Sequence, residues 1–234
     1  EVESILFKGL TKAQMITQKN VDAFKNPDIR QGGSIISSTK VGPSVAKDIT
    51  YGAIVSVILS LIAIFLYILL RFRNVAYSVG STVALAIDTV IVIGFYSLLW
   101  GIVPFSLEID QTFIGAILTI IGYSINDKVV VFDRIRENFQ LRGKKGDIQK
   151  LFNDALNATL GRTINTSMTV LIVLLCIFFF GGESIRSFSF AMIIGVVFGT
   201  LSSIFIAAPI AYITMGHEIK KAKAQELETA EVEA

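Results

Sequence analysis

The stretch ITYGAIVSVILSLIAIFLYILL at residues 49–70 decides the fold class, because it runs for 22 residues without a charged side chain. A helix needs about 20 predominantly apolar residues to cross the hydrocarbon core of a bilayer. Four further apolar stretches follow, at about 76–100, 111–132, 163–180 and 188–213. The sequence therefore predicts an all-α membrane protein with a bundle of five transmembrane helices.

The composition of the 234-residue chain supports the membrane class. Hydrophobic residues make up 53% and charged residues 17%, with a mean hydropathy of +0.65, whereas soluble domains typically carry about 25% charged residues. Cys176 is the sole cysteine and lies in an apolar run, and the single histidine, His217, follows the last span. No phosphate loop, metal-ligand spacing or nucleophile motif is visible. We therefore expect neither an enzyme nor a bound cofactor or metal.

The basic residues of the loops predict the orientation of the spans. Most follow the first, third and fifth spans: Arg71, Arg73, Arg134, Arg136, Arg142, Lys144, Lys145, Lys150, Arg162, Lys220, Lys221 and Lys223. The loop 101–110 has none, and the loop 181–187 has only Arg186. We therefore expect residue 1 in the periplasm and the C-terminus in the cytoplasm, with residues 216–234 as a charged tail.

Residues 1–48 are polar and contain seven Lys or Arg, although this orientation places them outside. They hold no apolar run long enough for a signal peptide, so an upstream transmembrane helix in a longer protein is the simplest explanation. Residues 10–25 read as an amphipathic helix and residues 33–41 as a strand. We expect the remnant of a small α+β periplasmic domain, followed by a transmembrane domain at 49–215.

Two further patterns concern helix packing. Residues 147–160 have one apolar face and are expected to form a separate helix along the cytoplasmic interface. In the fifth span, small residues recur every four positions, which permits close helix approach: Ala191, Gly195, Gly199, Ser203 and Ala207. Pro209 follows this ridge and is expected to kink the helix end.

Ionisable side chains at membrane depth are the functional candidates, because each costs at least about 2.5 kcal/mol on insertion scales. Asp88 lies near the middle of the second span, Asp127 and Lys128 near the cytoplasmic end of the third, and Arg162 at the start of the fourth. Two polar stripes at helical spacing contain these residues: Thr112, Thr119, Tyr123 and Asp127, and then Arg162, Asn165, Thr166 and Thr169. If the stripes face each other across a wet crevice, Asp127 could pair with Arg162. A carboxylate that alternates between burial and pairing takes up and releases protons.

Each candidate also has a purely structural interpretation. Asp127, Lys128 and Asp133 could be interfacial residues whose side chains reach water. Asp88 is too deep for that and could instead make a structural hydrogen bond to a neighbouring helix. Arg162 could serve the positive-inside rule alone.

Several long motifs resemble those of the SecF family of protein-export membrane proteins, over about residues 40–215. They are VGPSVAKDI (41–49), GYSINDKVVVFDRIREN (122–138), LNATLGRTINTSMTVL (156–171), GG (181–182) and IGVVFGTLSSIFIAAPI (194–210). The resemblance implies six transmembrane helices with a periplasmic domain between the first two, so that this chain would hold the last five.

The same resemblance implies a role in the bacterial inner membrane. SecF proteins belong to the resistance-nodulation-division superfamily and act with SecD, separate or fused as SecDF, and with the SecYEG channel. YajC is a further candidate partner. They use the proton motive force, or in some bacteria sodium, to draw unfolded polypeptide outward late in translocation. The partners expected for this chain are therefore these proteins, the exported polypeptide and the lipid bilayer, without nucleic acid.

The family's coupling residues fall, by motif, on Asp127 of the Ile125-Asn126-Asp127 triplet and on Arg162, with a further carboxylate supplied by SecD. The resulting ion or proton pathway comprises Asp127, Arg162, Asp88, Tyr123 and Asn126, and the packing residues are Gly195, Gly199 and Ser203. Two positions depart from the family pattern. Lys128 stands where a small hydroxylic residue is usual, and Ile87 stands where a histidine usually precedes Asp88.

Two other functions are open at this point. The chain could belong to a small-molecule or lipid exporter of the same superfamily, although the short outer segment shows no substrate pocket. It could also be a passive scaffold for SecD and the channel. Replacement of Asp127 by Asn separates the scaffold from the coupled machine.

Overall fold

The computed structural model describes residues 2–13, 16, 21–25, 43–142 and 148–217. These residues form helices and their connections, with no strand among them. The chain divides into two units, Glu1–Asp48 and Ile49–Ala234, and each is described by itself.

The first unit contains two short helices, α1 (Val2–Lys12) and α2 (Val21–Lys25). The rings of Phe7 and Phe24 lie 5.4 Å apart, and Phe24 is buried. A single helix would place these two residues about 25 Å apart, at 1.5 Å per residue. The predicted continuous helix at 10–25 is therefore wrong, because the two Phe rings pack against each other instead. The predicted strand at 33–41 lies outside the described residues.

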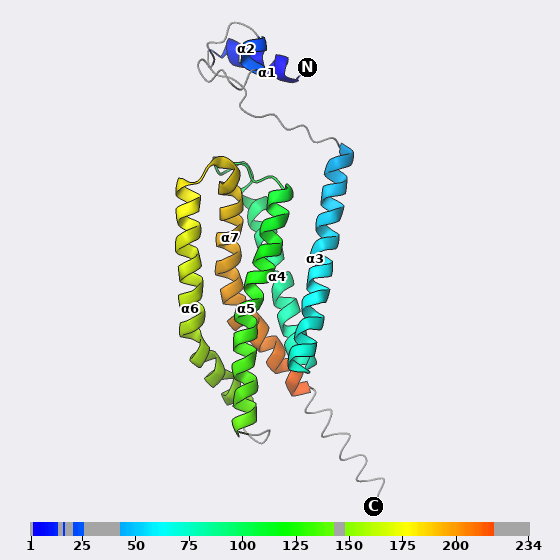
Figure 1. Ribbon diagram of the computed structural model, residues 1–234, viewed down its shortest axis with the longest axis vertical. Helices are drawn as coiled ribbons and strands as arrows, with labels where there is room; N and C mark the ends of the chain where they lie inside the picture. The colour runs from blue at the N-terminus through cyan, green and yellow to red at the C-terminus, as the bar shows by residue number, and fades with distance from the viewer. Residues whose placement is uncertain (1, 14–15, 17–20, 26–42, 143–147, 218–234) are drawn as a thin grey trace, which may run out of the picture. The chain divides into compact units, whose positions relative to one another are not determined.

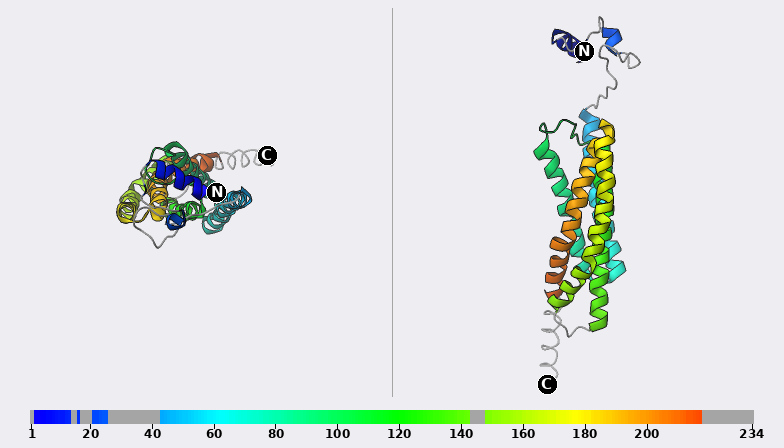
Figure 2. Two further views of the ribbon diagram at one scale, coloured as in Figure 1. Left: turned by 90° about the horizontal axis from the view of Figure 1, so that it is seen from above. Right: turned by 90° about the vertical axis from the view of Figure 1, so that its left-hand side faces the viewer.

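The second unit is built from long helices that run side by side along its long axis (Figures 1 and 2). They are α3 (Pro43–Phe72), α4 (Val75–Leu99), α5 (Gln111–Arg142), α6 (Ile148–Phe180) and α7 (Glu183–Ser202). Helix α7 continues through a π-helical segment, η1 (Ser203–Ala207), to His217. Five of these helical segments are long and apolar enough to cross a membrane, which confirms the prediction of five spans.

Helix α7 packs against α4, α5 and α6, and small residues line its contacts. Gly195 lies against the Ile120 side chain of α5, with no space for a Cβ. On the α4 side, a Cβ built on Gly80 would lie only 2.6 Å from the backbone oxygen of Ala207. Residues with larger side chains at these points would push the helices apart.

Helix α3 lies at the edge of the bundle (Figure 1). Its buried residues are Ile68 and Phe72 near its end, and the Phe72 ring packs edge-on against the Tyr77 and Phe132 rings. Large apolar side chains along the rest of the helix are exposed: Ile54, Ile58, Leu59, Ile62, Leu66 and Leu70. This outward apolar surface suits a helix that contacts lipid or another apolar helix.

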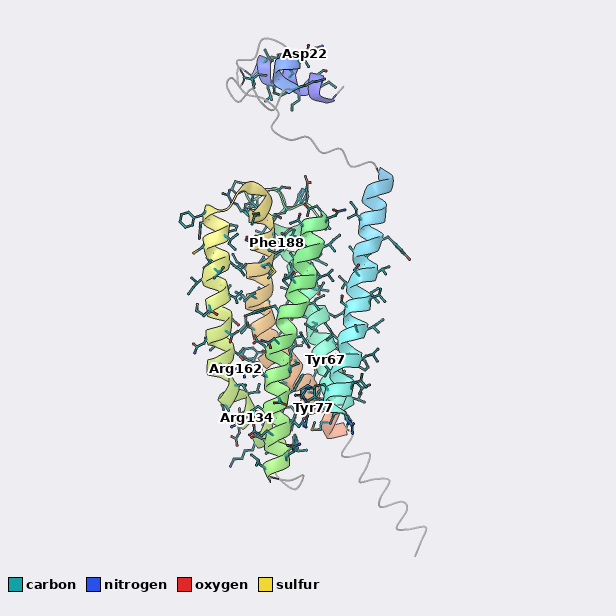
Figure 3. All side chains as sticks on the ribbon, in the orientation of Figure 1. Asp22, Tyr67, Tyr77, Arg134, Arg162 and Phe188 are labelled. Atoms are coloured by element: carbon teal, nitrogen blue, oxygen red, sulfur yellow. The ribbon has the colours of Figure 1, made fainter. Side chains whose placement is uncertain are left out.

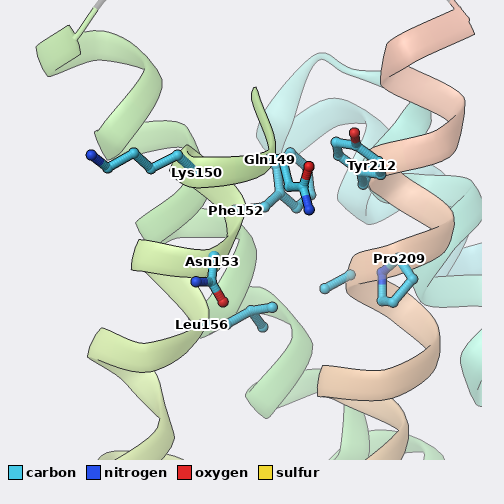
Figure 4. Close-up of a pocket in the computed structure, with 8 residues that line it drawn as sticks. Gln149, Lys150, Phe152, Asn153, Leu156, Pro209 and Tyr212 are labelled. Carbon is cyan, nitrogen blue, oxygen red and sulfur yellow. The ribbon is translucent and has the colours of Figure 1, made fainter. Parts of the chain in front are cut away.

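Helices α5 and α6 extend beyond the predicted third and fourth spans. The predicted interfacial helix at 147–160 is the first part of α6 rather than a separate element. The Phe152 ring packs edge-on against Phe139 of α5 and against Tyr212 beyond η1 (Figure 4). The apolar face of this segment is therefore covered by protein, which explains its amphipathic pattern.

The π-helical segment η1 ends just before Pro209. The backbone N–H of Ala208 donates to the oxygen of Ser203, five residues earlier. A proline ring clashes with the carbonyl four residues before it, which here is that of Phe205. The wider π turn accommodates this clash and continues the helix where the sequence predicted a kink.

Candidate functional site

The candidate site centres on Asp127 and Lys128, in the middle of α5. The helix runs ten residues beyond the predicted span end at 132, which adds about 15 Å. Asp127 is 4% exposed and Lys128 is fully buried. The interfacial interpretation of Lys128 is therefore wrong. Because consecutive helical residues point about 100° apart, these two side chains face different neighbours.

Lys128 lies in a buried polar cluster between α4, α5 and α7. Its ammonium group is 3.0 Å from Asp88 Oδ2 and donates hydrogen bonds to Ser124 Oγ at 2.6 Å and Ser202 Oγ at 3.1 Å. Ser124 Oγ in turn donates to Asp88 Oδ2 at 2.8 Å. Asp88 thus makes more than the structural hydrogen bond considered from the sequence, since it balances a buried lysine. We call these four residues the lysine cluster.

A glycine on α7 makes room for the lysine cluster. A Cβ built on Gly199 would lie 2.7 Å from Ser124 Oγ and 3.7 Å from Asp88 Oδ2. The Ser202 hydroxyl donates to the Gly199 oxygen at 3.0 Å, which orients its oxygen towards Lys128. The small residues of α7 therefore provide both close packing and one wall of the cluster.

Asp127 faces a second polar region, between α5, α6 and α7. The hydroxyls of Ser167 and Thr200 adjoin its carboxyl and lie 2.6 Å from each other. Among the described residues, nothing forms a hydrogen bond with Asp127 Oδ2, Tyr123 Oη or Thr163 Oγ1, and all three atoms are buried. Buried polar atoms without partners are uncommon in proteins, so this region is the natural place to look for an ion or proton path.

Arg162 lies on α6 with its side chain exposed. Its charge acts on the Asp127 carboxyl, but no ion pair joins the two among the described side chains, so the expected pairing is not found. Arg162 lines an open groove of about 470 Å³ with Arg71, Val129, Val130, Asp133, Arg134, Glu137, Ala158 and Thr159. In Figure 3, Arg162 and Arg134 lie in the half of the bundle where α5 ends.

The predicted polar stripes on α5 and α6 do not meet across a crevice. Asn126, Thr112, Thr119, Asn165 and Thr169 are all exposed. The Thr119 and Thr166 hydroxyls donate to backbone oxygens of their own helices, Gly115 at 2.7 Å and Arg162 at 2.9 Å. The α6 residues that approach Asp127 are instead on the adjacent face, which carries Thr163 and Ser167.

Four partners of the buried charges were not singled out from the sequence: Ser124, Ser167, Thr200 and Ser202. Two of them had a local signal. Ser124 precedes Lys128 by one helical turn, and Ser167 follows Thr163 by one turn, so each pair shares a face. The partners on α7 had no such signal, because only the tertiary fold brings them to α5 and α6.

Comparisons with known proteins place these residues in a family. The family described as protein export membrane protein SecD/SecF, C-terminal, matches residues 23–217. Protein translocase subunit SecF of Rhodothermus marinus is 52% identical over 176 residues, which cover 75% of this chain and 56% of that protein. Protein translocase subunit SecDF of Bacillus subtilis is 39% identical over 195 residues, 82% of this chain and 26% of that protein.

A solved structure has the same fold. The crystal structure of SecDF from Thermus thermophilus, a translocon-associated membrane protein, has a TM-score of 0.66 and 40% sequence identity, and the match covers 75% of this chain and 23% of that one. The chain spans about half the length of the SecF relatives from R. marinus and Haemophilus influenzae, 56% and 50%. The chain belongs to the SecD/SecF family of protein-export membrane proteins.

Proposed function

We propose that this chain is the membrane part of an accessory subunit of the bacterial Sec protein-export machinery. It couples a proton or sodium motive force to the late stages of translocation of an unfolded polypeptide, acting with SecD and the SecYEG channel, with YajC as a further candidate partner. The family match and the relatives named protein translocase subunits support this assignment.

The observation that carries the proposal is the state of the Asp127 carboxyl. It is buried in the middle of a long apolar helix, and its Oδ2 has no hydrogen-bond partner in the described part of the chain. The adjacent lysine is engaged with Asp88, at 3.0 Å. A buried carboxylate is strongly disfavoured unless a proton, a metal cation or a basic side chain balances it. Asp127 is thus suited to exchange one of these for another.

The surroundings of Asp127 provide a route towards one end of the bundle. The groove that contains Arg162 also holds the ion pairs Arg71–Asp133, at 3.9 Å, and Arg134–Glu137, at 2.6 Å. Approach of the Arg162 guanidinium to Asp127 would favour proton release, and its withdrawal would favour proton uptake. Tyr123, Thr163 and Ser167 supply hydroxyls along the contact between α5 and α6. The SecD carboxylate would complete the other half of the path.

We also propose a topology for the chain within the bacterial inner membrane. The five spans correspond to the last five of six family helices, residues 1–48 belong to a small periplasmic α+β domain, and the C-terminus is cytoplasmic. The Lys and Arg distribution in the loops supports this orientation. Single cysteines introduced at Glu108 and at Gln149 should react with a membrane-impermeant thiol reagent from opposite sides of intact cells.

Asp127→Asn tests the coupling role, in the full-length protein with its native partners. Export into inverted membrane vesicles is measured with and without an imposed ion gradient. We expect the variant to lose the gradient-stimulated part of export and to retain the gradient-independent part, because the amide cannot bind or release a proton. Glu108→Gln, a neutral substitution of an exposed loop residue, is the matched control and should behave as the unaltered protein.

Gradient-stimulated export that survives Asp127→Asn at the level of the control would remove this residue from the coupling path. The chain would then be better described as a scaffold for its partners. Vesicles should contain equal amounts of both variants, so that a loss of assembly is not read as a loss of coupling.

A further inference from the structure

The Lys128 ammonium is surrounded by oxygens from three helices. Asp88 Oδ2 of α4 lies at 3.0 Å, Ser124 Oγ of α5 at 2.6 Å and Ser202 Oγ of α7 at 3.1 Å. All four side chains are buried. We propose that this is an oxygen-lined site for a monovalent cation, that Lys128 occupies it as a tethered cation, and that it binds Na⁺ or another alkali cation when the ammonium is removed.

The ligand set matches a hard monovalent cation. Hard cations prefer carboxylate, hydroxyl and carbonyl oxygens. The site supplies one carboxylate and two hydroxyls, so one negative charge balances one positive charge. A further atom, Asp88 Oδ1, is buried and has no hydrogen-bond partner among the described residues. It is therefore available as an additional ligand.

The site is held open by the backbone around it and not by the lysine alone. Gly199 leaves the space that a side chain would fill beside Ser124 Oγ, at 2.7 Å from an added Cβ. The Ser202 hydroxyl is oriented by its hydrogen bond to the Gly199 oxygen, at 3.0 Å. Removal of the lysine side chain beyond Cβ would therefore leave preplaced oxygens around an empty, polar volume.

The tethered cation distinguishes the roles of the two buried carboxyls. Asp88 has a permanent counter-ion on the neighbouring helix, so it needs no mobile ion. Asp127, on the other side of α5, has none in its hydrogen-bonding shell and would remain the exchanging group. This last consequence rests on the proposed function, whereas the cation site itself does not.

Lys128→Ser tests the site, in the full-length protein purified in detergent with its native partners. Serine removes the ammonium and keeps a small hydroxylic side chain. The thermal unfolding midpoint is measured in choline chloride and in NaCl, LiCl or KCl at matched ionic strength. In choline we expect a loss of about 6–20 °C, since an unpaired carboxylate remains buried. Na⁺, or another of the alkali cations, should restore part of the loss with saturable concentration dependence.

Two companion variants identify the source of the effect. Asp88→Asn combined with Lys128→Ser removes the carboxylate and should abolish the response to alkali cations. The unaltered protein should show no difference between choline and alkali chlorides, because its site is occupied. If Lys128→Ser accumulates only in the presence of salt, it is purified in NaCl and then exchanged into choline.

Three outcomes would overturn the proposal. One is a Lys128→Ser variant as stable as the unaltered protein in choline. Another is a destabilised variant that no alkali cation rescues. The third is a rescue that persists without the Asp88 carboxylate. The readout is stability and not transport, so a failure of the Asp127 coupling role would leave this result unchanged.

Discussion

The buried ion pair between Asp88 and Lys128 predicts a large and strongly non-additive effect of substitution. Asp88→Asn would leave a buried ammonium, and Lys128→Met would leave a buried carboxylate. Removal of one partner of a buried pair costs about 3–5 kcal/mol, whereas neutral replacement of both partners is often nearly neutral. We therefore expect each single variant to lose about 3–5 kcal/mol in free energy of unfolding, and the double variant to lose no more than about 2 kcal/mol.

The coupling energy follows from these values. The two single losses sum to at least about 6 kcal/mol, against about 2 kcal/mol for the double variant, so the coupling is at least about 4 kcal/mol. Residual cost in the double variant reflects Ser124 and Ser202, whose hydroxyls lose the ammonium that they bind at 2.6 and 3.1 Å. Denaturant titration in detergent micelles, applied to all four proteins under one set of conditions, measures the cycle.

An exposed ion pair on the same helix provides the matched control. Arg134 and Glu137 lie 2.6 Å apart, but their side chains are 42% and 52% exposed. Pairs of this kind are worth about 0–1 kcal/mol, so the corresponding cycle with Arg134→Met and Glu137→Gln should show little coupling. Additive losses in the Asp88–Lys128 cycle, or a coupling no larger than in the control, would refute the charge-pair reasoning.

Two packing predictions use the same unfolding assay. Gly80→Ala should cost about 1–3 kcal/mol, because its Cβ would lie 2.6 Å from the Ala207 oxygen, whereas Gly94→Ala has no atom within 4 Å and should gain up to about 1 kcal/mol. Equal effects of the two substitutions would contradict the close α4–α7 contact. Tyr96→Phe should cost about 0.5–1.5 kcal/mol, because the Tyr96 hydroxyl donates to the Ser187 backbone oxygen at 2.6 Å. An unchanged unfolding midpoint would show that this hydrogen bond does not stabilise the fold.

The number of spans was predictable from the sequence, but the depth of the charged residues was not. Length and apolarity specify a transmembrane helix directly, and all five predicted spans are found. The predicted end of the third span at 132 rested on the charges of Asp133 and Arg134. Charged residues continue a helix as readily as they end a membrane span, so α5 runs on to Arg142. This difference moves Lys128 from a predicted interface to the middle of the helix.

The candidate site was predictable only where its members share a helix. Helical spacing brought Tyr123 and Asp127 together, and both do lie in the polar region beside α6. The facing residues depend on how α6 and α7 rotate about their axes, which spacing on α5 does not specify. The sequence therefore suggested Asn165 and Thr169, which are exposed, in place of Ser167. The partner of Lys128 is 40 residues away, and only the tertiary fold reveals it.

The balance of buried charges limits what the proposed coupling step can carry. Of the charged side chains in the described ranges, those buried are Asp88, Asp127 and Lys128. The first and third neutralise each other at 3.0 Å, so the remaining charge is that of Asp127. If Asp127 couples as proposed, one monovalent cation or the Arg162 guanidinium suffices to balance it, and two at once would leave a buried positive charge. This half of the machine would therefore exchange one cation per cycle, with Lys128 preventing Asp88 from binding a second.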